Sequence, residues 1–258
     1  MQHFKDQLQR TVRLAFPPRR IVSLVPSQTE LLHYLELNAE VVGITKFCIH
    51  PQEWFRTRTR VGGTKQLNLE VIRSLQPDLV IANKEENEQA QIAALEKSYP
   101  VWISDIHTLP DAYDMILRVG ALTGRDAPAA YLVQELQRRF AALPAARPPR
   151  KTAYFIWRNP WMVAAAQTFI DAMLQRCGLV NVFAGMTRYP QLTIPQLQAV
   201  QPELVLLSSE PYPFGRQHVA ELQAIYPQAE IRLVDGEMFS WYGSRLLHAA
   251  EYLAQAFH

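Results

Sequence analysis

A segment of 21 residues occurs twice in this chain, 125 positions apart. LNLEVIRSLQPDLVIANKEEN (67–87) and LTIPQLQAVQPELVLLSSEPY (192–212) align without a gap and share six identical residues. Solenoid repeats recur about every 20–50 residues, so one pair at this distance indicates two similar lobes instead. The 258 residues of the chain are enough for two lobes of ordinary domain size.

Each copy of the repeat has the same internal order. A helix-like segment ends at Gln-Pro, and a short apolar run follows it (residues 78–83 and 203–208). Proline does not continue a helix easily, and it pushes the residue before it to extended geometry. Each copy therefore predicts a helix, a strand and a loop, with the loop at the carboxyl end of the strand. Open α/β sheets bind their ligands at such ends.

The rest of the chain continues the alternation of strands and helices. In the first half we expect strands over 20–25, 40–45, 78–83 and 100–106, with helices over 29–37, 68–76 and 87–99. In the second half we expect strands over 151–157 and 230–235, and helices over 168–177 and 244–257. Ser27 and Glu30 fit a capping box, S-x-x-E, at the first helix. Short, fully apolar strands separated by helices predict parallel sheets covered on both faces.

One long helix is expected between the lobes. Apolar residues recur there at helical spacing, at Leu132, Val133, Leu136, Phe140 and Leu143. Asp126 suits the N-cap and Pro128 the first turn. We therefore predict an α/β protein of two Rossmann-like lobes (1–125 and 144–258) joined by a single helix (126–143). The Pro-rich segment 143–150 is expected to open the second lobe, and the ligand cleft to lie between the lobes.

Composition excludes several kinds of protein. The formal net charge is +2 and Lys and Arg are scattered, so no nucleic-acid partner is expected. No apolar run of 18 residues suggests a membrane span, and the first 16 residues do not resemble a signal peptide. Cys48 and Cys177 are the only cysteines and suit a reducing compartment. As written, the chain is expected to be cytoplasmic, or periplasmic if its true N-terminus was trimmed or misassigned.

The order of motifs resembles a known family. The resemblance covers residues 19–257 and rests on the motifs RIVSLVPSQTELL, VGGTKQLNLEVIRSLQPDLVIA, GALTGR, TFIDAMLQRCG and QPELVLLS. Together they resemble the helical-backbone (class III) substrate-binding proteins of ABC importers, which capture cobalamin, ferric siderophores, haem or, in one branch, zinc and manganese. The resemblance implies a monomer without a cofactor or catalytic residues, which captures a metal chelate such as a corrinoid or ferric siderophore. It also implies an ABC permease as partner.

Loops at strand ends supply the candidate ligand-binding residues. In the first lobe these are Ser27, Gln28, Cys48, His50, Thr64, Lys65, Lys84, Glu85 and Asn87. In the second lobe they are Trp157, Arg158, Trp161, Arg188, Tyr189, Glu210, Phe214, Trp241 and Tyr242. Aromatic rings give flat apolar contact at low entropic cost, which suits a large planar or macrocyclic ligand. Trp102 lies within an expected strand and is assigned to the core.

The resemblance also assigns individual positions. Tyr189 falls where cobalamin-binding members carry an aromatic contact, whereas Thr64 replaces a second aromatic. Glu70 matches a glutamate that docks on the permease, but its counterpart in the other lobe is Pro195, which has no charge. Lys65, Lys84 and the arginines of the second lobe are candidates to meet an anionic ligand.

Other functions stay open at this point. Cys48 and His50 form a C-x-H pair, and Glu85 and Glu210 supply carboxylates, but a metal site needs three or four convergent ligands. The sequence contains no G-x-S-x-G elbow, no G-x-G-x-x-G and no P-loop. One alternative is a cytosolic chaperone for a corrinoid or another chelate, without a transporter. The other is an enzyme on the same fold, with Cys48, His50 or Glu85 as its reactive groups.

Overall fold

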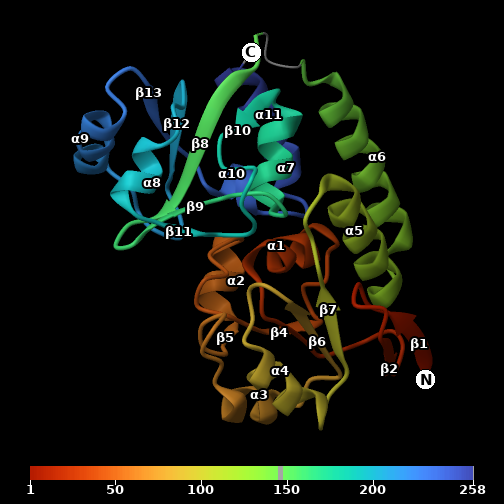
Figure 1. The fold of residues 1–258 in the computed structure, drawn as a ribbon. Helices are drawn as coiled ribbons and strands as arrows, with labels where there is room; N and C mark the ends of the chain where they lie inside the picture. Colours follow the sequence, from red (N-terminus) through yellow and green to blue (C-terminus); the bar gives the residue numbers. More distant parts are fainter. Residues whose placement is uncertain (145–147, 258) are drawn as a thin grey trace. The chain divides into compact units, whose positions relative to one another are not determined.

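The structure of the protein is a computed structural model that describes residues 1–144 and 148–257 (Figure 1). The chain forms two compact units. Unit 1 comprises residues 1–106, 110–135 and 242–245, and unit 2 comprises 107–109, 136–241 and the residues from Leu246 onward. The Pro-rich segment expected at the start of the second lobe includes residues 145–147, which lie outside the described residues.

Unit 1 is built on a parallel sheet of the kind that the sequence predicts. Its strands follow the order β5-β4-β3-β6-β7, and every neighbouring pair is parallel. The strands are β3 (Ile21–Ser23), β4 (Val41–Ile44), β5 (Thr59–Arg60), β6 (Leu79–Asn83) and β7 (Val101–Ser104). The order reverses direction between β3 and β6, and this switch point is where doubly wound sheets open a crevice at their carboxyl ends.

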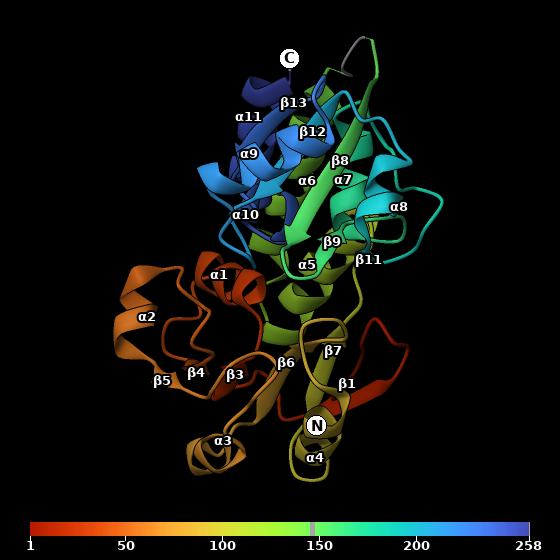
Figure 2. The same ribbon diagram turned by 60° about the vertical axis from the view of Figure 1, so that its left-hand side comes forward.

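Helices surround this sheet (Figures 1 and 2). They are α1 (Pro26–Tyr34), α2 (Gln52–Thr57), α3 (Leu69–Leu75), α4 (Gln89–Glu96) and α5 (Leu109–Thr123). Strands β3, β6 and β7 are buried along their whole length, as expected for a sheet covered on both faces. Trp102 in β7 is fully buried, which confirms its assignment to the core.

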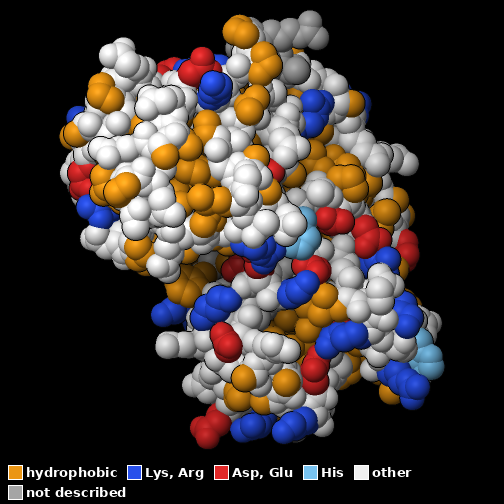
Figure 3. Space-filling model, in the orientation of Figure 1, with side chains coloured by type: hydrophobic (Ala, Val, Ile, Leu, Met, Phe, Trp, Pro, Cys, Tyr) orange, Lys and Arg blue, Asp and Glu red, His pale blue; other side chains and the backbone are white. Residues whose placement is uncertain are grey.

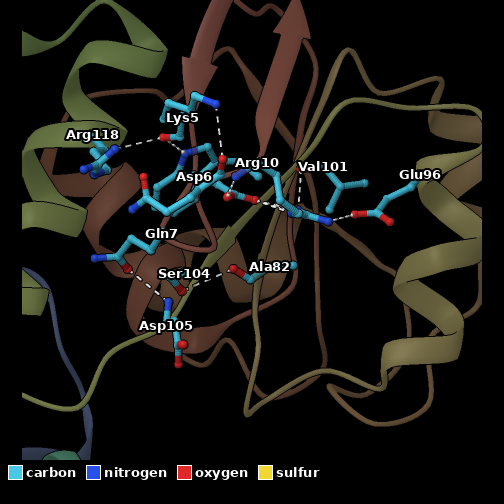
Figure 4. Close-up of polar contacts among 12 residues, drawn as sticks. Lys5, Asp6, Gln7, Arg10, Ala82, Glu96, Val101, Ser104, Asp105 and Arg118 are labelled. Atoms are coloured by element: carbon cyan, nitrogen blue, oxygen red, sulfur yellow. Dashed lines mark hydrogen bonds and ion pairs between the residues drawn. The ribbon is translucent and has the colours of Figure 1, made fainter.

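An N-terminal hairpin, which the sequence analysis did not predict, completes unit 1. Its antiparallel strands are β1 (Gln2–Lys5) and β2 (Thr11–Leu14). Between them the buried Asp6 accepts hydrogen bonds from the main chain and guanidinium of Arg10 at 2.8 and 2.7 Å. The main-chain N–H of Gln7 donates to Ile103 at 3.1 Å, and the side chain of Gln7 accepts from the N–H of Asp105 at 3.0 Å (Figure 4). The hairpin is therefore fastened to the end of β7.

Unit 2 contains a mixed sheet. Its parallel part consists of β8 (Arg150–Trp157), β12 (Leu204–Ser208), β13 (Glu230–Val234) and β10 (Leu179–Asn181). Two antiparallel strands, β9 (Trp161–Val163) and β11 (Gln191–Leu192), extend it beyond the parallel arrangement that the sequence predicted. They do so because residues 158–160 reverse the chain tightly after β8. The helices are α7 (Phe169–Arg176), α8 (Ile194–Gln198), α9 (Arg216–Ile225), α10 (Glu237–Ser240) and α11 (Leu246–Phe257).

The helix predicted over 126–143 is present as α6 (Asp126–Ala142). Leu132, Leu136 and Phe140 are buried, as their helical spacing predicted. The helix belongs to unit 1 up to Glu135 and to unit 2 from Leu136.

The predicted capping box at the first helix is wrong. Helix α1 begins at Pro26, one residue before Ser27, and no side chain caps it. Pro26 takes the first helical position because its fixed φ suits a helix and its missing N–H costs nothing there. Glu30 instead accepts two hydrogen bonds from the guanidinium of Arg245, at 2.9 and 2.7 Å.

The two copies of the repeat fold alike. In each, a helix (α3 or α8) leads through a buried proline (Pro77 or Pro202) into a fully buried strand. The strands β6 (79–83) and β12 (204–208) occupy the same repeat positions, 125 residues apart. The repeat therefore encodes the same helix–proline–strand element in unit 1 and in unit 2.

The acidic residue after each proline has the same structural role in both copies. Asp78 accepts hydrogen bonds from the main-chain N–H groups of Arg19 and Arg20, at 2.7 and 2.8 Å, just before β3. Glu203 accepts one from the N–H of Lys151 at 2.8 Å, at the start of β8. Charge-assisted bonds of this kind are about twice as strong as neutral ones. Each carboxylate thus holds the beginning of the neighbouring parallel strand.

We predict that Asp78→Ala lowers the free energy of unfolding by about 2 kcal/mol, since it leaves two N–H groups without their charged acceptor. Glu203→Ala should cost about half as much, since only one bond is lost. Urea denaturation of each variant measures both values. The exposed Glu88, whose side chain does not cap its helix, supplies the control Glu88→Ala. Equal, negligible losses in all three variants would contradict the proposed task.

Candidate functional site

The carboxyl ends of the parallel strands in unit 1 bring several loops to one edge of the sheet. Seven of the nine residues that the sequence predicted for the first lobe lie in these loops, and Ser27 and Gln28 lie in the first turn of α1, which follows β3. Their side chains differ sharply in exposure. Lys65 and Lys84 are exposed, His50, Thr64 and Glu85 are half-buried, and Ser27, Gln28, Cys48 and Asn87 are buried.

Asn87 ties three of these loops together. Its side-chain oxygen accepts a hydrogen bond from the N–H of Asn83 at 2.9 Å, at the end of β6. Its amide nitrogen donates to the carbonyls of Thr64 at 3.1 Å and Leu24 at 3.4 Å, in the loops that follow β5 and β3. The hydrogen-bonding capacity of this amide is thus used within unit 1. Asn87 shapes the edge of the sheet, and we no longer assign it to ligand contact.

In the loop after β4, the predicted site residue Cys48 is buried and its two neighbours are exposed. The Cys48 side chain is fully buried, with its Sγ 3.1 Å from the hydroxyls of both Thr29 and Thr45. Burial raises the pKa of this thiol, so it lacks the thiolate character that a nucleophile needs. Phe47 and Ile49, on either side of it, are 50% and 41% exposed.

These two apolar residues are functional candidates that were not among the predicted site residues. Cys48 and His50 were predicted for their chemistry, whereas the large apolar side chains that alternate with them were not singled out. The alternation itself was the available signal, because a buried Cys48 turns both neighbours outward.

Gln28 also serves the interior of unit 1. Its amide nitrogen donates to Ser104 Oγ, which accepts from Asn83 Nδ2 at 2.9 Å as well. Among the exposed groups, Lys84 pairs with Asp105 at 2.6 Å, and Lys65 donates to the main-chain carbonyl of Glu85 at 2.6 Å. The outward surface of this edge therefore includes exposed lysines and exposed apolar side chains.

In unit 2, the corresponding edge carries a cluster of aromatic rings. Trp157 at the end of β8 packs edge-on against Tyr212, at 5.5 Å between ring centroids, and Tyr212 packs on Phe214 at 4.9 Å. Phe214 stacks on Trp161 at 6.3 Å with an interplanar angle of 4°. Trp157 is 38% exposed, whereas Trp161 and Phe214 are nearly buried. Trp157 is therefore the exposed face of a stacked apolar platform.

Polar contacts fix the platform from both sides. The guanidinium of Arg158 lies 4.3 Å above the ring of Trp161 and forms an ion pair with Glu221 at 2.8 Å. His218 Nδ1 accepts the N–H of Gly215 at 2.9 Å, so its Nε2 carries the proton toward the Tyr212 hydroxyl, 3.0 Å away. Tyr212 and His218 were not among the predicted site residues.

Glu210 is held in the loop after β12. Its Oε1 accepts hydrogen bonds from Ser240 Oγ and Trp241 Nε1, both at 2.8 Å. Burial raises the pKa of this carboxyl, and the nearby charges of Glu237 and Asp235 raise it further, while the two hydrogen bonds act in the opposite direction. Trp241 thereby orients the carboxyl group of the repeat loop.

Other predicted residues of the second lobe have different surroundings. Arg188 Nη1 lies 3.2 Å from His107 Nδ1 and 3.3 Å from the carbonyl of Gln167, and the adjacent Tyr189 is half-buried. Tyr242 belongs to unit 1 and not to the second lobe, because the segment 242–245 packs there. The bidentate pair between Glu30 and Arg245 anchors that segment.

The arrangement does not favour direct binding of a bare metal ion. Within residues 1–144 and 148–257, no group of three or more His, Cys, Asp or Glu side chains is placed to hold one. A metal could still arrive already enclosed in an organic ligand, for which exposed rings and charged groups are suitable contacts.

Comparison with known proteins identifies the relationships of this chain. The profile of a family described as periplasmic binding protein matches residues 21–224. A vitamin B12-binding protein of Vibrio cholerae is 27% identical over 218 residues, which cover 81% of this chain and 79% of that relative.

Solved structures agree with this relationship. The crystal structure of a periplasmic vitamin B12 binding protein from Vibrio cholerae is 25% identical, covers 93% of this chain and 97% of its own, and superposes with a TM-score of 0.76. A periplasmic heme-binding protein from Roseiflexus sp. RS-1, at 24% identity, covers 93% of this chain and 97% of its own and shares the fold with a TM-score of 0.80. These structures match the predicted fold of two α/β lobes.

We predict that Glu210→Gln changes how stability depends on pH. The folded-state pKa of Glu210 is raised, so its proton stabilises the fold below the ordinary glutamate value of about 4.3. The free energy of unfolding of the wild type should therefore fall as pH rises through the folded-state pKa of Glu210. Glu210→Gln keeps an oxygen for Ser240 and Trp241, and its free energy of unfolding should show no such fall. Urea denaturation from pH 4 to 8 tests this, with Glu88→Gln as control. Parallel curves for the wild type and Glu210→Gln would refute it.

Proposed function

The chain belongs to the periplasmic binding protein family, and we propose that its ligand is a metal chelate such as a corrinoid, haem or ferric siderophore. The family consists of binding proteins, so ligand capture without turnover is its activity, and the enzyme alternative is set aside. The observation that carries the choice of ligand is the exposed Trp157 on its aromatic platform, since a flat ring surface suits a large macrocycle or chelate.

The proposed binding surfaces are the carboxyl edges of the two sheets. Unit 1 offers Phe47 and Ile49 together with exposed lysines, and unit 2 offers Trp157 with Tyr212 and Phe214 behind it. We keep His50, Thr64, Arg188 and Tyr189 as candidate contacts. Gln28, Cys48 and Asn87 act as supports of the unit 1 edge in this proposal.

We propose that the partner is an ABC permease and that the protein works in the periplasm. Family membership supports this setting over the cytosolic chaperone and over the cytoplasmic location expected from the sequence as written. Glu70 is exposed in the first turn of α3 and is available for docking. Pro195 occupies the same repeat position in α8 and is also exposed, so docking there relies on shape or on other residues. No helix within the described part of the chain has both the length and the apolar character to span a membrane.

A ligand panel tests the proposed function. Purified protein would be titrated by calorimetry with cobalamin, cobinamide, haem, several ferric siderophores, Zn²⁺ and Mn²⁺. We expect saturable binding of at least one chelate at micromolar concentration or below, and none of the bare ions. Binding of a bare ion alone would contradict capture of a chelate, and flat titrations throughout would overturn the proposed ligand class.

We predict that Trp157→Ala and Phe47→Ala each weaken binding of that chelate about tenfold, because each removes exposed apolar contact area. Both side chains are partly exposed, so the fold should be retained. Trp161→Ala is a poorer probe, since removing a nearly buried tryptophan costs about 3–5 kcal/mol of stability. Tyr131, an aromatic residue on α6 that is 66% exposed, provides the control Tyr131→Ala. Unchanged affinity in the first two variants would place the ligand elsewhere.

A further inference from the structure

We infer that the captured chelate is anionic and that its carboxylate groups meet the ammonium groups of Lys46 and Lys65, an inference that rests on the proposed capture function. Lys46 was not among the predicted site residues, and its position becomes clear only in the folded chain.

Three exposed lysines follow three strands of the unit 1 sheet. Lys46 comes after β4, Lys65 after β5 and Lys84 after β6, all at the carboxyl edge. Figure 3 shows Lys and Arg side chains lying among hydrophobic ones on the surface of this unit. Parallel strands place these three ends on the same edge, so lysines far apart in the sequence share one surface.

Local contacts bring the loops that carry the lysines together. Gly63 has no side chain, and a Cβ added there would lie 3.3 Å from Lys46 Cε and 3.1 Å from the Phe47 ring. The stem of Lys46 therefore lies against the loop that carries Lys65. The ammonium group of Lys65 in turn donates to the main chain of Glu85, directly beside Lys84.

Two of the three charges have no carboxylate partner among the described residues. Lys84 is neutralised by Asp105, 2.6 Å away. Lys65 bonds only to a main-chain carbonyl, and Lys46 lies 5.1 Å from the centroid of the Phe47 ring. The other carboxylates of this edge belong to the half-buried Glu85 and Glu86, which take part in contacts of their own.

This arrangement favours a ligand with negative groups at its rim. An ammonium group without a carboxylate partner in the protein attracts a carboxylate at the rim of the ligand. Phe47 and Ile49, exposed in the same loop as Lys46, supply apolar surface for the body of the ligand. The site thus combines an apolar contact with a cationic rim, which discriminates a carboxylate-bearing macrocycle from one with neutral amides or esters.

The test compares each macrocycle with a form in which carboxylates are exchanged for neutral esters or amides. Ferric protoporphyrin IX is paired with its dimethyl ester, and cobalamin with the derivative whose peripheral amides are hydrolysed to acids. Affinities are measured by titration in wild type, K46Q/K65Q and the control K97Q, with circular dichroism to verify folding. Lys97 is exposed at the end of α4, which precedes the start of β7.

We expect the acid form of the bound macrocycle to bind about tenfold more tightly than its neutral form, as for two partly exposed ion pairs. The preference should shrink with added salt and largely disappear in K46Q/K65Q, but not in K97Q. If both forms bind wild type equally, or if K46Q/K65Q keeps the preference, the inference is overturned while capture stands. If no chelate binds at all, both the inference and the proposed function fail.

Discussion

Parallel pairing between the central strands is the constraint on which the rest of this protein depends. In unit 1 it joins β3 to β6, and in unit 2 it joins β8 to β12. Parallel strands end at the same edge, so residues far apart in the sequence meet there. The carboxylates of Asp78 and Glu203 hold the beginning of the partner strand in each unit and so fix the pairing at its start.

The two edges have complementary character. Unit 1 presents lysines and two apolar side chains over a dense hydrogen-bonded support, in which Asn87 links three loops. Unit 2 presents an exposed tryptophan on a stack of buried rings. The unit 1 edge therefore offers charged groups, and the unit 2 edge offers aromatic area.

Much of the fold could be predicted because it depends on short-range patterns. Pro77 and Pro202 keep the residues before them out of helical geometry, and α3 and α8 end upstream of them, at Leu75 and Gln198. The short apolar runs that follow, bounded by turn signals, are typical of buried strands. The prediction of a capping box was wrong because it used only the local motif of Ser27 and Glu30. Glu30 instead pairs with Arg245, more than 200 residues away. The N-terminal hairpin was missed because no side chain of β1 is fully buried, and because Gln7 fastens the hairpin to Asp105, 98 residues away.

By itself, the sequence determined the parallel α/β class, the division into two similar halves and the long helix, and it predicted the loops in which a site would lie. The tertiary structure decided which side chains in those loops face outward. Cys48 points inward to Thr29 and Thr45, and this exposes Phe47 and Ile49. Whether a loop residue is buried depends on what neighbouring strands place beside it, and that information is spread over segments that meet only in the folded chain.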